Sequence, residues 1–71
     1  MRMIVVGTYR TRSDAEFARA ALAAAGIQSV LEADDAGGAY PFDLAGGARV
    51  LVDEADAATS LEILDEQRRD G

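Results

Sequence analysis

The residue types that most often carry out catalysis are missing from this sequence of 71 residues. It contains no His and no Cys, and all seven of its basic residues are Arg. An imidazole base, a thiolate nucleophile or metal ligand, and a Lys for a Schiff base or a phosphate-binding loop are therefore excluded. Ser13, Ser29 and Ser60 have no imidazole or amine base to activate their hydroxyls. We expect no catalytic residues and no cofactor, and so a protein that is not an enzyme.

Three aspartates are the candidates for a metal site. Asp34 and Asp35 are adjacent, and Asp43 follows across a glycine-rich segment. Carboxylate oxygens suit a hard cation, but this spacing does not match that of calcium-binding loops. The pattern favours aspartates that end a strand and solvate a turn. We therefore predict no metal site.

Two arginines flank the start of a predicted helix. Arg10 and Arg12 precede Ser13, and the free N–H groups and the dipole of a helix N-terminus favour a bound anion. These three residues are a candidate site for a phosphate or carboxylate ligand. Asp14 and Glu16 bring negative charge to the same end of the helix, so the alternative is that both arginines only solubilise the surface.

The segment Gly37–Gly47 is the most distinctive stretch of the chain. Two Gly pairs enclose apolar residues, which predicts a loop with an apolar centre. Either Phe42 and Leu44 fold over the open end of the core, or the loop is exposed and recognises a partner. In the second case the partner-binding residues are Tyr40, Pro41, Phe42 and Leu44.

The sequence has 13 acidic and 7 basic residues, which gives a formal net charge of −6. Such a surface repels phosphate backbones, so nucleic acid is not an expected partner. The longest run of bulky apolar residues, residues 3–6, is far too short for a membrane span or for the core of a signal peptide. We expect a cytoplasmic protein without membrane contact.

The elements that position these residues begin with a predicted strand over Arg2–Tyr9, which is apolar on both faces as in a covered or central position. Ser13 and Glu16 have the spacing of a capping box, which predicts that Ser13 caps the first helix. Gly26 is expected to end this helix, since the residue after a helix often takes a left-handed conformation. The apolar face between them consists of Phe17, Ala18, Ala21, Leu22 and Ala25.

A second strand is predicted over Ile27–Asp34 and a third over Ala48–Val52. The second is more polar than the first, as expected of an edge strand. Asp53 can cap a second helix, and Arg68 and Arg69 suit the negative C-terminal end of that helix. The inner stripe predicted for it consists of Ala57, Leu61 and Leu64, flanked by Ala58 and Ile63.

The order strand–helix–strand–strand–helix predicts an α+β fold in one domain, residues 1–71. A right-handed crossover through the first helix makes the first two strands parallel and places the third between them, antiparallel to both. The predicted sheet order is therefore first–third–second, with both helices on one face. This is a ferredoxin-like plait without its last strand.

The order and spacing of several segments resemble a known family. The segments are Tyr9 to Glu16, Ala25 to Ile27, Tyr40-Pro41, Gly46 to Val52, and Ala57 to Leu64. They resemble small prokaryotic proteins that are named for signal transduction, have no known function, and are similar in fold to the PII (GlnB-like) signal proteins. The resemblance covers about Val5 to Leu64 and implies a regulatory or binding role. In the PII proteins, the loop that corresponds to Gly37–Gly47 contacts protein partners.

These features favour a non-enzymatic binding module, signal-transducing or regulatory, that contacts an unidentified protein partner through the Gly37–Gly47 loop. One alternative is a small-anion or nucleotide sensor that uses Arg10, Arg12 and the start of the first helix. Another is a structural oligomerisation domain.

The first strand is expected to have one unpaired edge. A bare edge on such an apolar strand templates aggregation, and a chain of this size has a thin core. Either the Arg68–Gly71 tail folds back over the edge, or a second copy of the chain pairs with it across a two-fold axis. Because the tail is short and charged, we predict a homodimer through the first strand, with residues 3 to 7 in its interface.

Overall fold

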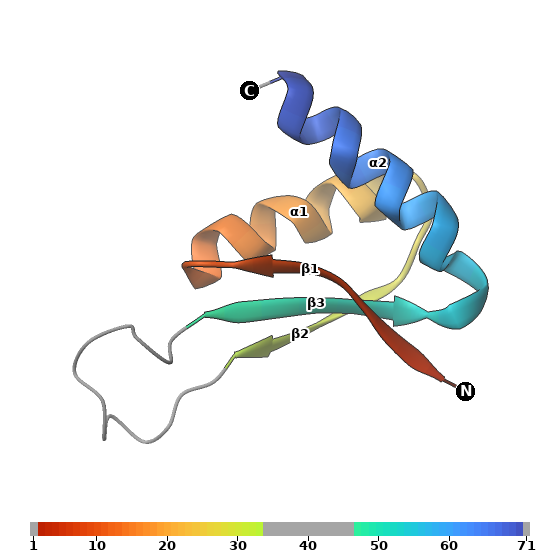
Figure 1. Cartoon of the computed structure of the whole chain (residues 1–71), viewed down its shortest axis with the longest axis horizontal. Coiled ribbons are helices and arrows are strands. Elements are labelled where there is room, and N and C mark those ends of the chain that lie inside the picture. The colour runs from red at the N-terminus through yellow and green to blue at the C-terminus, as the bar shows by residue number, and fades with distance from the viewer. Residues whose placement is uncertain (1, 34–46, 71) are drawn as a thin grey trace.

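The described part of the protein contains three strands and two helices (Figure 1). This computed structural model describes residues 2–33 and 47–70. The elements are β1 (Met3–Tyr9), α1 (Arg12–Ala24), β2 (Ser29–Ala33), β3 (Ala48–Asp53), a 3-10 turn η2 (Glu54–Asp56) and α2 (Ala57–Asp70). The predicted order of elements is confirmed, and each strand begins within two residues of its predicted start.

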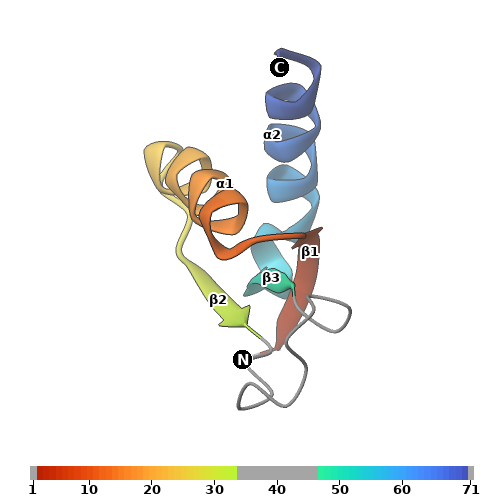
Figure 2. The ribbon, with the colours of Figure 1, turned by 90° about the vertical axis from the view of Figure 1, so that its left-hand side faces the viewer.

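The sheet has the order β1-β3-β2, and β3 is antiparallel to both neighbours. The predicted sheet order is therefore confirmed. Figure 2 shows both helices on the same side of the three strands, as predicted, with α1 nearer to β2 and α2 nearer to β1. The fold is α+β with two layers, and neither helix covers the opposite face of the sheet.

The core lies between the helices and one face of the sheet. The central strand β3 contributes Ala48, Val50 and Val52, which are 1%, 0% and 0% exposed. The alternating residues Arg49 and Leu51 point to the opposite face, because successive side chains of a strand point to opposite sides. The other buried apolar residues are Val6, Ala15, Ala18, Leu22, Ile27 and Leu64.

The prediction of a covered or central first strand is wrong, because β1 is an edge strand of the described sheet, and neither helix covers one of the faces of that sheet. On that face, Met3 and Val5 are 37% and 45% exposed. The register with β3 slips between Val5 and Gly7, so that Val6 is an extra residue in a β-bulge. Val6 is buried in the core. The bulge thus adds an apolar side chain to the helix-covered side of an edge strand.

The start of α1 also differs from the prediction. Thr11, not Ser13, is the N-cap: its backbone is extended, and its Oγ1 accepts a hydrogen bond from the N–H of Asp14 at 3.1 Å. Ser13 lies within the first turn of the helix. The capping-box prediction is therefore wrong, because the chain becomes helical at Arg12, before it reaches Ser13.

The predicted end of α1 at Gly26 is confirmed. Gly26 has φ +83, and its N–H donates to the Ala23 carbonyl at 2.9 Å, while the Ile27 N–H donates to the Leu22 carbonyl at 2.9 Å. These two bonds form a Schellman motif, which needs a left-handed residue at the Gly26 position. Leu22 and Ile27 are both buried in the core, so the motif also anchors the helix end by apolar contact.

Two large apolar side chains predicted to be inside are exposed. Phe17 is 73% exposed and Leu61 is 52% exposed. Ala25, also predicted inside, is exposed as well. Ala18, Leu22 and Leu64 are buried as predicted, and Ala15 on α1 and Ser60 on α2 are buried although they were not predicted to be. Small side chains at these positions let the helices approach the sheet and each other, so each helix is rotated relative to the stripe that its largest residues predict.

The second helix is otherwise close to its prediction. Asp53 Oδ2 accepts the Ala55 N–H at 3.2 Å and so caps η2, which leads directly into α2. Arg68 and Arg69 lie in the last turn of α2, as predicted. The alternative in which residues 68–70 fold back over the first strand is wrong, because they continue the helix.

Thr11→Ala is expected to lower the free energy of unfolding by about 1 kcal/mol, because the Asp14 N–H loses its acceptor. This corresponds to a melting temperature lower by roughly 4–8 °C for a domain of this size. Ser13→Ala is the matched control, and it should leave the melting temperature unchanged or slightly higher. A loss of stability in Ser13→Ala with none in Thr11→Ala would restore Ser13 as the cap.

Ser60→Ala is expected to stabilise the protein by about 1 kcal/mol, because a buried hydroxyl without a hydrogen bond is destabilising. The Ser60 side chain is 0% exposed, and its Oγ has no hydrogen-bond partner among the described residues. Thr59→Ala, at an exposed position of the same helix, is the control and should change stability less. Chemical denaturation of the three proteins measures both effects; a less stable Ser60→Ala would show that the hydroxyl has a partner.

Candidate functional site

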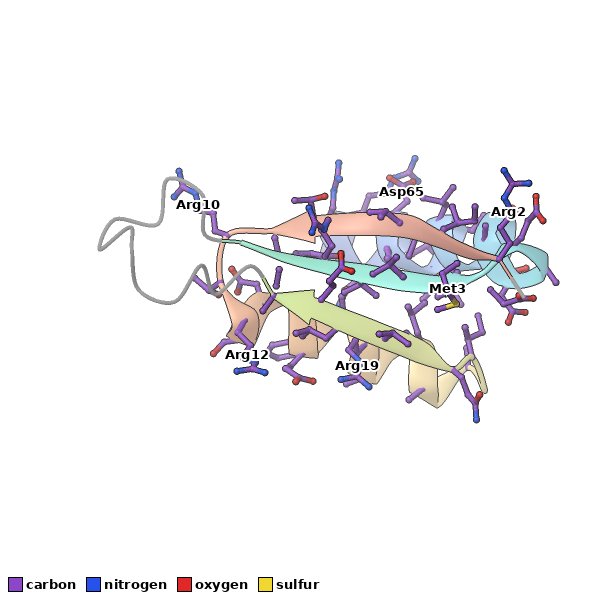
Figure 3. The ribbon with its side chains drawn as sticks, turned by 90° about the horizontal axis from the view of Figure 1, so that it is seen from below. Arg2, Met3, Arg10, Arg12, Arg19 and Asp65 are labelled. Carbon is purple, nitrogen blue, oxygen red and sulfur yellow. The ribbon has the colours of Figure 1, made fainter. Side chains whose placement is uncertain are left out.

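The face of the sheet that the helices leave uncovered is the candidate functional site, and we call it the open face. Figure 3 views the molecule onto this face, with the helices behind the strands. Its described residues follow from the strand register and the alternation of side chains. They are Met3, Val5 and Thr8 on β1, Arg49, Leu51 and Asp53 on β3, and Val30 and Glu32 on β2.

An apolar row crosses the middle of the open face. Leu51 on the central strand lies opposite Val5 on one side and Val30 on the other. Val5 and Val30 are 45% and 51% exposed, and Leu51 between them is half-buried. Of the five exposed large apolar side chains among the described residues, three lie on this face: Met3, Val5 and Val30. Exposed apolar surface is thus concentrated on the open face.

On the open face, the row of residues nearest to the C-terminal end of β1 is polar. Arg49 on β3 lies opposite Thr8 on β1 and Glu32 on β2. The Arg49 Nη2 atom is 2.8 Å from Glu32 Oε1, and the Arg49 Nε donates to the same oxygen at 3.0 Å. Both side chains are about half exposed, so water screens the pair and its contribution to stability is small. Its main effect is to neutralise two charges beside the apolar row.

The partner-binding residues predicted from the sequence lie outside the described part of the chain. They are Tyr40, Pro41, Phe42 and Leu44, and the rejected metal candidates Asp34, Asp35 and Asp43 lie there too. The flanking residues are described: Ala33 at the end of β2 pairs with Ala48 at the start of β3. The segment therefore leaves and re-enters the sheet beside the Thr8–Arg49–Glu32 row.

All three predicted anion-binding residues are exposed. Arg12 and Ser13 lie in the first turn of α1, but Figure 3 shows the Arg10 side chain on the other side of the ribbon from Arg12, so the structure does not bring the three together. Because Thr11 is the N-cap of α1, the Ser13 hydroxyl is not used to cap the helix. Arg12 and Ser13 line a shallow depression together with Glu16 and Phe17. Arg10, labelled in Figure 3, lies at the opposite end of the sheet from Met3. The exposed ring of Phe17 beside Ser13 is a feature that the helical pattern did not predict.

Sequence reasoning also missed the role of Arg19. Its Nη2 donates to the Ser29 carbonyl and its Nε to the Ser29 Oγ, both at 3.2 Å, while its Nη1 is 3.3 Å from Glu16 Oε1. These bonds tie the start of β2 to α1. No sequence pattern indicated them, because the two residues become neighbours only when β2 folds back beneath the helix.

Tyr9 lies at the end of the sheet where Ala33 and Ala48 pair, and its side chain is partly buried against the core. Its ring lies over Gly7: a Cβ atom added to Gly7 would come within 2.7 Å of the Tyr9 ring and hydroxyl. Gly7 thus provides the space into which the ring packs. Burial raises the pKa of the Tyr9 hydroxyl above its ordinary value of 10.0, and the positive charge of Arg68 opposes part of this rise.

The described residues provide no metal centre, because no three potential ligands among them lie close enough together to hold a metal ion. In the same part of the chain, neither helix has the length and apolar character needed to cross a bilayer. Comparisons with protein-family models, curated proteins and solved structures find no match to the chain.

The raised pKa of Tyr9 predicts a loss of stability at high pH. The neutral phenol is favoured in the folded state, so this contribution is complete below pH 10 and is lost as the pH rises through the folded-state pKa. The chain has two tyrosines, so Tyr40→Phe leaves Tyr9 as the only phenol. Its absorbance titration near 295 nm should have a midpoint above 10. A midpoint at or below 10 would contradict the burial of the hydroxyl.

Proposed function

We propose that the protein is a non-enzymatic binding module of the cytoplasm, signal-transducing or regulatory, that contacts a protein partner. The observation that supports this most directly is the open face, where Val5, Leu51 and Val30 form an apolar row that neither helix covers. Apolar side chains that gather on one exposed face are typical of surfaces that bind other proteins. The chain contains no His, Lys or Cys and so has few side chains suited to catalysis. Binding to a protein partner requires none of these three residue types.

The arrangement of elements agrees with this proposal. The sheet order β1-β3-β2 with two helices on one face is compatible with a ferredoxin-like, GlnB-like plait, which is the fold that we propose. By resemblance to the PII proteins, we propose that the connection between β2 and β3 contacts the partner. The residues proposed to do so are Tyr40, Pro41, Phe42 and Leu44. Since this connection begins and ends beside the open face, one partner can contact both.

A small-anion or nucleotide sensor is the second candidate. It is favoured by the depression in which Arg12, Ser13 and Phe17 meet at the start of α1. There a phosphate would bind the hydroxyl and the guanidinium, and a base would stack on the phenyl ring. Glu16 lines the same depression and repels an anion, which places this function second.

An oligomerisation domain is the third candidate, and self-association is also compatible with the first. We propose a homodimer that includes residues 3 to 7 of β1. In its support, β1 pairs with β3 on one edge only among the described strands, and Met3 and Val5 are exposed on the open face.

A capture experiment tests the proposed function. Immobilised wild-type protein should retain a specific partner from a lysate of the source organism. The double variant Tyr40→Ala, Phe42→Ala should retain at least about tenfold less, because aromatic side chains at the centre of an interface contribute most of the binding energy. Phe17→Ala is the matched control, since Phe17 is an aromatic residue 73% exposed on α1. Circular dichroism verifies that each variant is folded.

Equal recovery by the double variant and the wild type would contradict binding through the Gly37–Gly47 loop. Recovery of no partner, together with a melting temperature that millimolar phosphate or nucleotide raises in the wild type but not in Arg12→Ala, would favour the anion sensor instead.

A further inference from the structure

On the open face, residues of opposite charge lie on the two sides of Leu51. Arg49 lies two residues before Leu51 on β3, and Asp53 lies two residues after it. Positions separated by two residues share one face of a strand, so all three belong to the open face. The strand therefore presents a positive charge, an apolar centre and a negative charge in line.

A two-fold axis above Leu51, midway between the two copies, parallel to the sheet and perpendicular to β3, makes this arrangement complementary to itself. Each strand then faces the same strand of a second copy, running in the opposite direction. The apolar row Val5–Leu51–Val30 runs parallel to the axis and packs against the same row of the second copy. Arg49 faces the partner's Asp53, and by symmetry this contact occurs twice.

We propose that two copies of the chain associate in this way, face to face through their open faces, to form a four-layer assembly with the helices outside. This proposal rests on the binding function proposed above and names one partner for the open face, a second copy. Sheets packed in this manner lie about 10 Å apart with interdigitated side chains, which removes Val5, Val30 and Met3 from water.

The net charge of the chain favours this face over the others. Two copies that each carry a charge of −6 repel each other. The open face holds two acids, Glu32 and Asp53, and one base, Arg49, so only one of the six excess negative charges lies on it. The guanidinium of Arg49 has five N–H donors, so it can keep its contact with Glu32 and also bind the partner's Asp53.

The bulge in β1 favours packing by faces rather than by edges. Pairing of two β1 strands needs a regular ladder, and the register of β1 is interrupted between Val5 and Gly7. Bulges of this kind protect edge strands from pairing. They leave the side chains of Met3 and Val5 free to pack, so residues 3 to 7 still contribute to the interface.

The size of the open face predicts the strength of the dimer. Its strands have five to seven residues, so at about 3.3 Å per residue and about 4.8 Å between strands the face projects to roughly 20 by 15 Å. Two such faces bury less than the roughly 1,200 Å² at which standard specific interfaces begin. The expected dimer is therefore weak and dissociates upon dilution into the micromolar range.

Sedimentation equilibrium of the full chain over a concentration series tests the dimer. The mass should rise from the 7.5 kDa of one chain to twice that value. Val30→Glu places two like charges opposite each other across the axis, so it should weaken the dimer by at least about tenfold. Phe17→Glu makes the same change in charge on the exposed side of α1 and should leave the dimer unchanged. Circular dichroism confirms that both variants fold.

A charge exchange tests the orientation of the two copies. Arg49→Asp and Asp53→Arg should each weaken the dimer, and the double variant should recover most of the lost affinity, because the opposite charges then meet again with their positions exchanged. Since Asp53→Arg also removes the carboxylate that caps η2, circular dichroism must show that each variant is folded before the affinities are compared. A chain that stays monomeric at millimolar concentration overturns the proposal. So does a dimer that is indifferent to Val30→Glu, which would indicate pairing through the β1 edge. Neither result bears on the capture of another protein, so the binding function is tested separately.

Discussion

Every other element of the protein is positioned by the central strand β3, whose alternate residues are buried beneath both helices. Ala48, Val50 and Val52 lose essentially all contact with water, and this burial is the main favourable term available to a chain of this size. Because successive side chains of a strand point to opposite faces, the same packing places Arg49 and Leu51 on the open face. The hydrogen-bond ladders then align β1 and β2 with β3 and extend both faces to the neighbouring strands.

Small side chains set how closely the helices approach this strand. Ala15 and Ala18 on α1 and Ser60 on α2 occupy fully buried positions where a larger residue would hold the layers apart. The thin core that results explains why Phe17 and Leu61 remain outside, since no buried space is left for them. It also explains why the Ser60 hydroxyl, enclosed by close packing away from water, has no hydrogen-bond partner in the part of the chain that the structure describes.

The open face is therefore a consequence of how the core is built. Two helices are enough to cover one side of a three-stranded sheet, and the other side keeps the apolar residues that the strands need for their own stability. On this face, the Arg49–Glu32 pair adds a polar contact beside the apolar row. The bonds from Arg19 to Ser29 lie on the other side of the sheet, where they hold β2 against α1. Neither helix covers the apolar row from Val5 to Val30, and it is the feature through which we propose that the protein binds.

The sequence by itself determined the order of the elements, the sheet order and the end of α1 at Gly26, because strand alternation, glycine conformation and crossover handedness are local or topological rules. It also determined that imidazole, thiol and amine chemistry is absent. Only the tertiary structure decided that Thr11 caps α1, that Ser60 rather than Leu61 faces inward, and that Val5, Leu51 and Val30 form one row. These outcomes depend on how closely two layers pack and on which residues of distant strands become neighbours. No local sequence pattern encodes the packing distance or the choice of neighbours.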